Sequence, residues 1–495
     1  MGETKDRTKI AVIGGGVIGG GWAARFALAG HDVAVYDPDP EAERKIGEVY
    51  ANAEAATRRL YVAPLPAPGA ITYAASIAEA VAGVGWVQES VSERLDLKHR
   101  VYAEIQETLD AEAVIGSSTS GFKPSELQQG AKDPGQIIVA HPFNPVYLLP
   151  LVELVPGPDG DPRAVDWAKK LLGGVGMHPL VVRQEIDAHI ADRFLEAVWR
   201  EALWLVKDGV ATTAEIDDAI RYGFGLRWAQ MGLFETYRVA GGEAGMRHFM
   251  EQFGPALKWP WTKLMDVPDF DDDLVDLIAG QSDEQSGMHS IRDLERIRDD
   301  NLVGILQALK AKPWGAGETV AAHEKRLREL SFAGAGEALD VSAPLALHSA
   351  TVLPEWVDYN GHMTEFRYLH VFGDATDAFL TAIGMDAAYM AGGRSIYTVE
   401  THLRHVAEVR EGRPLVVETQ LLGHDEKRIR IAHIMREGEG GTVLATAEHM
   451  LLSVNTAESR ACPLVAPVTE HLARIWAGHS ALAAPDFAGR AIRAL

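Results

Sequence analysis

The sequence predicts a doubly wound α/β sheet, then an all-helical region, and finally an α+β domain with an antiparallel sheet. Three observations lead to this fold class. Short apolar runs alternate with helical stretches at the start of the chain, which is typical of a parallel sheet covered by helices. Residues 189–310 are rich in Ala, Leu, Glu and Arg. Four strand-like runs with turn residues between them then occupy residues 397–455.

The first βαβ unit can be assigned directly from the sequence. An apolar run at residues 9–13 predicts a buried strand, and residues 22–29 predict a helix that ends at Gly30. A second strand at residues 32–36 ends at Asp37. Further strands are expected at residues 85–87, 114–117, 137–140 and 151–155. The connection within the first βαβ unit should be right-handed.

The later regions follow from changes in composition. Residues 364–383 read as one helix, and the strand-like runs follow it at residues 397–409, 415–423, 427–436 and 442–455. The glycine-rich stretch at residues 333–336 reads as part of a linker. We therefore place the domains and the linker at residues 1–188, 189–325, 326–340 (the linker) and 341–495.

Charge and cysteine content limit the possible functions. The formal net charge of −23 argues against nucleic-acid binding, which needs clustered Lys and Arg. An acidic surface fits a cationic substrate, or it only keeps the protein in solution. Cys462 is the one cysteine, so a disulfide within the chain and a four-cysteine metal site are impossible, and we expect no metal. No apolar run is long enough to span a bilayer, so we expect no membrane contact and a cytoplasmic location.

A glycine-rich turn lies between the first strand and the first helix and predicts a dinucleotide site. Its glycines allow a tight turn, close approach to a pyrophosphate, and close packing of helix on strand. Asp37, at the end of the next strand, would bind ribose hydroxyls and repel a 2′-phosphate, which favours NAD over NADP. A glycine turn without a ligand is the alternative. The predicted site residues of this turn are Gly14, Gly15, Gly16, Val17, Ile18 and Gly19.

Further motifs, in order along the chain, resemble the 3-hydroxyacyl-CoA dehydrogenase superfamily over residues 8–310. They are Glu89-Ser90-Val91-Ser92-Glu93 with Lys98, Ser117-Ser118-Thr119-Ser120, and His141-Pro142-Phe143-Asn144-Pro145 with Glu153. The resemblance implies a Rossmann domain that binds NAD and, after it, a helical domain for substrate binding and dimerisation.

The resemblance also implies roles for single residues. His141 matches the general base that takes the hydroxyl proton, and Glu153 matches the carboxylate that orients it. Ser120 matches the serine that binds the substrate oxygen, while Glu93, Lys98 and Asn144 match positions near the nicotinamide ribose. For Lys98 the alternative is an ordinary solvated lysine on a helix, and for His141 a structural histidine at a strand end.

Two departures from the superfamily pattern point to the substrate. Asp192-Arg193 stands where the superfamily usually has Asn-Arg, and an anion there suits a cationic substrate or perturbs the base. The residues after His141, Tyr147 to Pro156, resemble the branch that acts on small hydroxy acids, such as L-gulonate and L-carnitine.

Aromatic residues of the helical region favour a trimethylammonium group, because aromatic faces and a carboxylate hold such a cation. Filling of a helical core is the alternative. An arginine such as Arg193 or Arg227 would hold the substrate carboxylate. The aromatic residues that we single out are Tyr222, Phe224, Trp228 and Phe234, with Trp259 and Trp261 further along the chain.

The segment from Trp356 to Met363 resembles the active-site loop of hotdog-fold thioesterases of the 4-hydroxybenzoyl-CoA type, over about residues 341–460. The resemblance implies that Asp358 is the nucleophile or general base, acting on an acyl-CoA thioester, with a helix N-terminus that polarises the carbonyl. A catalytically silent oligomerisation module is the alternative.

Together the resemblances imply a bifunctional enzyme. NAD-dependent oxidation of L-carnitine gives 3-dehydrocarnitine, and hydrolysis of betainyl-CoA gives glycine betaine and CoA. The acyl transfer between these two steps has no candidate domain. The alternative is a dehydrogenase for L-gulonate or another 3-hydroxy acid with a non-catalytic hotdog module. Both families tend to dimerise, so we expect a homodimer.

Overall fold

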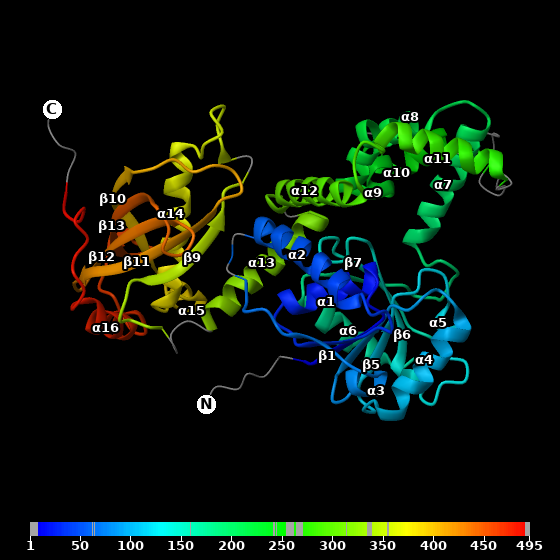
Figure 1. Ribbon diagram of the computed structural model, residues 1–495, viewed down its shortest axis with the longest axis horizontal. Helices are drawn as coiled ribbons and strands as arrows, with labels where there is room; N and C mark the ends of the chain where they lie inside the picture. The colour runs from blue at the N-terminus through cyan, green and yellow to red at the C-terminus, as the bar shows by residue number, and fades with distance from the viewer. Residues whose placement is uncertain are drawn as a thin grey trace. The chain divides into compact units, whose positions relative to one another are not determined.

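The computed structural model describes residues 8–490 except 62, 64, 159, 241, 242, 244, 254–261, 264–270, 313, 334–338, 354 and 355. The chain divides into two compact units (Figure 1). The first comprises Met1–Tyr61 and Leu65–Glu324, and the second Val62–Pro64 and Lys325–Leu495. Among the described residues, no helix is long and apolar enough to cross a membrane.

The first unit is built around a sheet with the strand order β3-β2-β1-β4-β5-β6-β7-β8. Neighbouring strands run parallel except β6 and β7, which are antiparallel. This order matches a doubly wound Rossmann sheet extended at one edge. The strands are β1 (Ile10–Ile13), β2 (Val33–Tyr36), β3 (Ile71–Tyr73), β4 (Trp86–Glu89), β5 (Val114–Ser117), β6 (Ile137–Pro142), β7 (Leu151–Val155) and β8 (His178–Val181).

Helices cover both faces of this sheet (Figure 1). One face packs against α1, α2 and α6 through a core that includes Trp22, Phe26 and Ile46. The opposite face packs against α3, α4 and α5 through Val101 and Leu127, among others. The helices are α1 (Val17–Leu28), α2 (Ala42–Leu60), α3 (Ile77–Ala80), α4 (Leu95–Thr108), α5 (Pro124–Leu127) and α6 (Pro162–Gly174).

The region after β8 is helical. A π-helical segment, Ile220–Phe224, joins α8 to α9. Helix α12 returns to the sheet domain, where Val303 and Leu306 pack with Ala56 and Leu60 of α2. The helices are α7 (Ala191–Lys207), α8 (Thr213–Ala219), α9 (Gly225–Ala240), α10 (Gly245–Phe253), α11 (Asp272–Ser286), α12 (Ile291–Lys310) and α13 (Ala316–Ala333).

The second unit has an antiparallel sheet with the order β10-β13-β12-β11-β9, and β14 pairs with β13. The long helix α14 lies against this sheet (Figure 1), and its Phe372 and Phe379 are fully buried. This is the expected hotdog arrangement. The elements are β9 (Leu345–Thr351), α14 (Glu365–Ala382), α15 (Ala387–Ala391), β10 (Arg394–His405), β11 (Pro414–His424), β12 (Arg428–Glu437), β13 (Val443–Asn455), β14 (Arg460–Ala461) and α16 (Val468–His479).

The fold class predicted from the sequence is confirmed, with local differences. Strands β3, β8, β9 and β14 and helices α15 and α16 were not predicted. The segment proposed as a linker, residues 326–340, begins inside α13, which continues to Ala333 because its Ala, Glu, Arg and Leu residues favour a helix. Residues 334–338, which include most of the glycine-rich stretch, lie outside the described residues.

Candidate active sites

The glycine turn has the geometry of a dinucleotide cradle. Gly14 has a φ of +98°, which favours glycine, and a Cβ on Gly19 would stand 1.8 Å from the Gly14 carbonyl oxygen. A Cβ on Gly16 would meet nothing within 4 Å, so the turn is open on that side. Val17 and Ile18 begin α1, whose first turn holds no acidic residue and no side-chain cap. Its free N–H groups therefore suit a pyrophosphate.

Asp37 lies at the carboxyl end of β2, beside the turn. Its Oδ2 accepts a hydrogen bond from the Gly15 N–H at 2.5 Å, and its Oδ1 accepts one from the Asp39 N–H at 2.7 Å. The carboxylate is therefore held next to the glycines, where a ribose bound over the turn would reach it. These residues fit the dinucleotide that the sequence predicts.

His141 and Glu153 face each other across the antiparallel strands β6 and β7, where they are direct partners. His141 Nδ1 lies 3.1 Å from Glu153 Oε2, and both side chains are buried. Burial alone would raise the pKa of Glu153, but hydrogen bonds from His141 and from the Ala191 and Ile190 N–H groups outweigh it and lower the pKa. An ionised Glu153 accepts a hydrogen bond from the protonated Nδ1 of His141, so Nε2 keeps a free lone pair.

Asp192 stands on the other side of the imidazole. Its Oδ2 lies 3.6 Å from His141 Nε2, too far for a hydrogen bond but close enough for a strong electrostatic effect. Burial raises the pKa of Asp192, and the Glu153 charge adds to this rise. Arg193, the next residue on α7, is exposed. The imidazole therefore lies between two carboxylates.

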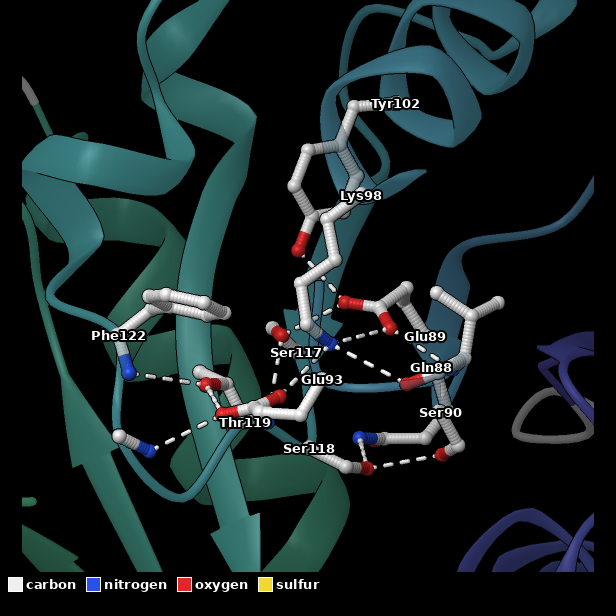
Figure 2. Close-up of polar contacts among 12 residues, drawn as sticks. Gln88, Glu89, Ser90, Glu93, Lys98, Tyr102, Ser117, Ser118, Thr119 and Phe122 are labelled. Atoms are coloured by element: carbon white, nitrogen blue, oxygen red, sulfur yellow. Dashed lines mark hydrogen bonds and ion pairs between the residues drawn. The ribbon is translucent and has the colours of Figure 1, made fainter. Parts of the chain in front are cut away.

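Lys98 belongs to a buried polar network, shown in Figure 2. Its side chain on α4 is only 1% exposed, so the alternative of a solvated lysine is wrong. Its Nζ lies 2.8 Å from Glu89 Oε1 and 3.3 Å from Glu93 Oε2. The other Glu89 oxygen accepts hydrogen bonds from Tyr102 Oη at 2.6 Å and Ser117 Oγ at 2.7 Å.

Glu93 connects this network to the loop after β5. It accepts a short hydrogen bond from the Thr119 hydroxyl and one from the Gly121 N–H at 3.1 Å (Figure 2). These two residues flank Ser120, which is exposed. Because β5 and β6 are parallel neighbours, Ser120 and His141 lie at the same sheet edge. Asn144 is exposed in the connection after β6.

The aromatic residues predicted for the substrate lie in the helical region. Tyr222 and Phe234 are 77% and 69% exposed, and Phe224 packs on Trp228 with ring centroids 4.6 Å apart. Trp228 lines a pocket of about 460 Å³ with Trp314. Between described residues, no hydrogen bond or ring contact links these side chains to His141. Trp259 and Trp261 lie outside the described residues.

In the second unit, Asp358 lies in the loop before α14. Its Oδ1 accepts a hydrogen bond from the Asn360 N–H at 2.8 Å, and this bond is the main reason that the pKa of Asp358 is lowered. His362 Nδ1 lies 3.3 Å from Glu408 Oε2. No side chain caps the N-terminus of α14. An ionised carboxylate thus lies a few residues before uncapped N–H groups, as the thioesterase resemblance implies.

Two site residues escaped the sequence analysis, although both lie within or close to motifs that it named. Glu89 begins the motif that contains Glu93, but only the fold shows that it pairs with Lys98. His189 lies three residues before Asp192, and its ring centroid is 5.5 Å from that of His141. Among the described residues, no group of three or more His, Cys, Asp or Glu side chains suits a metal ion.

Fold and site together define an NAD-binding dehydrogenase joined to a thioesterase-like domain. Family models agree with this. The NAD-binding domain of 3-hydroxyacyl-CoA dehydrogenase matches residues 9–186 and its C-terminal domain matches residues 189–267. The thioesterase-like superfamily matches residues 352–474.

Full-length relatives narrow the family further. A protein of Agrobacterium fabrum named L-carnitine dehydrogenase/betainyl-CoA thioesterase is 63% identical over 490 residues, which is 98% of each chain. A protein of Ruegeria pomeroyi with the same name is 59% identical over 98% of this chain and 99% of its own. The chain belongs to the family of L-carnitine dehydrogenase/betainyl-CoA thioesterases.

Shorter relatives and a solved structure match the first unit. An L-carnitine dehydrogenase of Mesorhizobium japonicum is 60% identical over 65% of this chain and 90% of its own. The crystal structure of FHMPC 5-dehydrogenase, an NAD+ dependent dismutase, aligns with a TM-score of 0.52 at 25% identity. It covers 61% of this chain and 98% of that protein.

Proposed function

We propose that this chain is a bifunctional enzyme that oxidises L-carnitine to 3-dehydrocarnitine with NAD and hydrolyses betainyl-CoA to glycine betaine and CoA. One observation carries the dehydrogenase assignment: the buried His141–Glu153 pair leaves Nε2 free as a base, and Asp192 Oδ2 lies 3.6 Å from that nitrogen. The names of the full-length relatives support both activities.

His141 acts as the general base in this proposal. Glu153 holds the Nδ1 proton, so Nε2 accepts the proton of the substrate hydroxyl as the alcohol becomes a ketone. NAD supplies the hydride acceptor when it is bound. Ser120 binds the substrate oxygen, and Glu93, Lys98 and Asn144 hold the nicotinamide ribose in place.

Asp192 selects a cationic substrate in this proposal. In L-carnitine the ammonium nitrogen is one carbon away from the carbinol carbon, so a group beside the hydroxyl is also beside the cation. Asp192 is half-buried next to the base, where solvent screens its charge only partly. In this proposal Arg193 binds the substrate carboxylate. The candidates for contact with the methyl groups of the trimethylammonium are Tyr222, Phe224, Trp228 and Phe234.

The substrate is tested by following NADH absorbance with L-carnitine, L-gulonate and 3-hydroxybutyryl-CoA. We expect rapid reduction of NAD with L-carnitine only. His141→Ala should lower kcat by ~10²–10⁴ if the histidine is the general base. A wild-type enzyme that reduces NAD with L-gulonate but not with L-carnitine would refute the assignment.

Asp192→Asn tests the cation selection separately. The change keeps the shape of the side chain and removes its charge. We expect kcat/KM for L-carnitine to fall about tenfold or more, since a partly buried charge pair is lost. The ratio of activity on L-carnitine to activity on 3-hydroxybutyrate, which keeps the carboxylate but lacks the ammonium group, should fall with it. An unchanged ratio would show that residues other than Asp192 bind the ammonium group of the substrate.

Asp358 is the catalytic carboxylate of the second activity in this proposal. Hydrolysis is measured as release of the CoA thiol from betainyl-CoA. Asp358→Asn should abolish this release and leave NAD reduction intact, while His141→Ala should do the reverse. If Asp358→Asn still hydrolyses betainyl-CoA, the nucleophile or base lies elsewhere. A wild-type enzyme that does not release CoA from betainyl-CoA would refute this activity.

We also propose that the protein is a cytoplasmic homodimer. Large apolar side chains are exposed on α7, including Phe194, Leu195 and Trp199. Clusters of this kind usually mark association sites. The single cysteine fits a reducing compartment. Light scattering on the purified protein should give twice the mass of one chain. In a Leu195→Glu variant the measured mass should fall towards that of a single chain.

A further inference from the structure

The backbone just before α7 adopts an unusual conformation. Ala188 and His189 have φ angles of 59° and 50°, so two successive residues with side chains lie in the left-handed region. Residues other than glycine rarely adopt it, and they keep it only where the surrounding structure holds them there. Such positions cluster at functional sites, and this one lies beside His141.

The left-handed turn directs two backbone N–H groups towards the Glu153 carboxylate. The N–H groups of Ile190 and Ala191 both point to Glu153 Oε1, at 3.0 and 3.1 Å. The other oxygen, Oε2, receives Nδ1 of His141. Each oxygen of Glu153 thus has its own partners, and the turn fixes the oxygen that His141 does not contact. The donors lie at the N-terminus of α7, which favours a carboxylate.

The His189 ring holds this turn in place. Its Nε2 lies 3.2 Å from the carbonyl oxygen of Thr119. A carbonyl only accepts hydrogen bonds, so Nε2 carries the proton and donates it. Thr119 precedes Ser120, so this hydrogen bond joins the turn to the loop that carries the proposed oxygen-binding serine. A backbone bond from the Ala188 N–H to the Gly121 carbonyl oxygen, at 3.3 Å, joins the same two segments. The other nitrogen, Nδ1, is buried and has no hydrogen-bond partner among the described residues.

A purely space-filling role does not explain His189. The side chain is fully buried, and a phenylalanine would fill the space without an unsatisfied lone pair. The ionisable groups around it are His141, Glu153 and Asp192. Burial, and then the nearby His141, lower the pKa of His189, which agrees with a neutral ring that donates through Nε2.

We propose that His189 is a positioning residue for the general base. By binding the Thr119 carbonyl it fixes the left-handed turn, the turn fixes Glu153 through two N–H groups, and Glu153 fixes the tautomer and direction of His141. This inference rests on the proposed dehydrogenase function. The hydrogen bond from His189 to Thr119 also connects the Ser120 loop to the turn that positions His141. Both groups proposed to contact the substrate hydroxyl are therefore positioned through His189.

The test compares two substitutions in the full-length enzyme. His189→Phe keeps the ring volume and removes the donor, whereas His189→Gln keeps a donor near the position of Nε2. We expect His189→Phe to fold and to bind NADH normally, with a modest loss of stability because the Thr119 carbonyl loses its donor. Its kcat with L-carnitine should fall about 10- to 100-fold, because a small displacement of the base is costly. His189→Gln should recover most of this loss.

The pH profile separates positioning from folding. If Glu153 is displaced in His189→Phe, it stabilises the protonated imidazole less, and the acid limb of kcat/KM should move to lower pH. Wild-type kcat and pH profile in His189→Phe would overturn the proposal. If that variant does not fold, a His189→Gln enzyme that folds but has lost its kcat would overturn it. An inactive wild type would instead refute the dehydrogenase assignment.

Discussion

The ammonium of Lys98 and the carboxylate of Glu89 form an ion pair from which water is excluded, with side-chain exposures of 1% and 0%. Removing water from two charges is costly, and good geometry only partly offsets the cost. The pair is therefore weak evidence for stability. The ion pair instead positions the Lys98 ammonium next to Glu93, beside the predicted site of the nicotinamide ribose.

Glu89→Gln should be strongly destabilising for this reason. The change leaves the Lys98 charge buried with only the half-exposed Glu93 as an ionic partner. Loss of one partner of a buried pair typically costs about 3–5 kcal/mol. Urea unfolding measures this cost. The double variant Glu89→Gln with Lys98→Met should recover part of the stability. A single variant as stable as wild type would show that Glu93 suffices.

The resemblance to the 3-hydroxyacyl-CoA dehydrogenase superfamily predicted the pair His141 and Glu153, and the fold brings these two side chains together. The burial of Lys98, in contrast, could not be predicted from the sequence. Lys98 lies on a helix where an exposed lysine is the ordinary expectation, and its partner Glu89 is on β4, which is adjacent only in the fold. The left-handed turn at Ala188 and His189 carries no glycine, so no residue type marked it.

Among the elements, the turn between β1 and α1 offers a matched pair of glycines. A Cβ on Gly19 would collide with the Gly14 carbonyl, whereas one on Gly16 would meet open space. Gly19→Ala should therefore disturb the packing of α1 on the sheet and lower the unfolding temperature. Gly16→Ala should unfold like wild type and bind NADH weakly, because the pyrophosphate must approach there. Equal NADH affinity in Gly16→Ala would place the cofactor elsewhere.

The antiparallel sheet of the second unit buries neutral histidines. Burial lowers the pKa of His348 and His449 to about 4, and that of His433 lies well below its ordinary value of 6.5. In the unfolded chain these rings gain protons near pH 6.5. Below that pH the unfolded state binds more protons than the folded one, so stability falls as the pH falls.

Calorimetry should therefore show this domain losing stability from about pH 6.5 to about pH 4, by up to ~1.4 kcal/mol per pH unit for each ring. His449→Gln should make the slope shallower, since Gln does not titrate. His424, which is exposed, provides the control: His424→Gln should leave the slope as it was. If the slope of stability against pH is the same in His449→Gln as in the wild type, other groups cause the loss of stability at low pH.

Element prediction succeeded where periodicity was strong and failed where elements were short. Strands β5 and β7 match their predicted bounds, and α14 differs from them by one residue at each end. Strand β3 has three residues and little burial, so it carries no apolar run to detect. Strand β9 pairs with β11 at the edge of its sheet, and its stretch of Ala, Leu and Ser lacks a clear alternation.

For the whole molecule, the two units have separate hydrophobic cores. The cores of the second unit draw only on residues after position 338. Relatives named L-carnitine dehydrogenase, from Mesorhizobium japonicum and Pseudomonas putida, match only 65% and 61% of this chain. The dehydrogenase half thus occurs in proteins that lack a counterpart of the remainder.

A fragment that begins at Leu339 should therefore fold by itself. We expect a single cooperative unfolding transition and, if Asp358 is catalytic, undiminished release of CoA from betainyl-CoA. Circular dichroism and a thiol assay measure the two outcomes. The matched fragment with Asp358→Asn should fold equally well and be inactive. An unfolded fragment would show that the second unit needs the first to become stable.

The antiparallel pairing of β6 and β7 bears on how this enzyme can diversify. His141 and Glu153 are direct partners in the ladder, so the interval of twelve residues is only the length of the connection between them. Insertions in that connection would leave the pair intact, whereas a slip of one residue in the ladder would turn Glu153 to the opposite face. The connection can therefore change in length during evolution or engineering while the proposed catalytic pair stays in register.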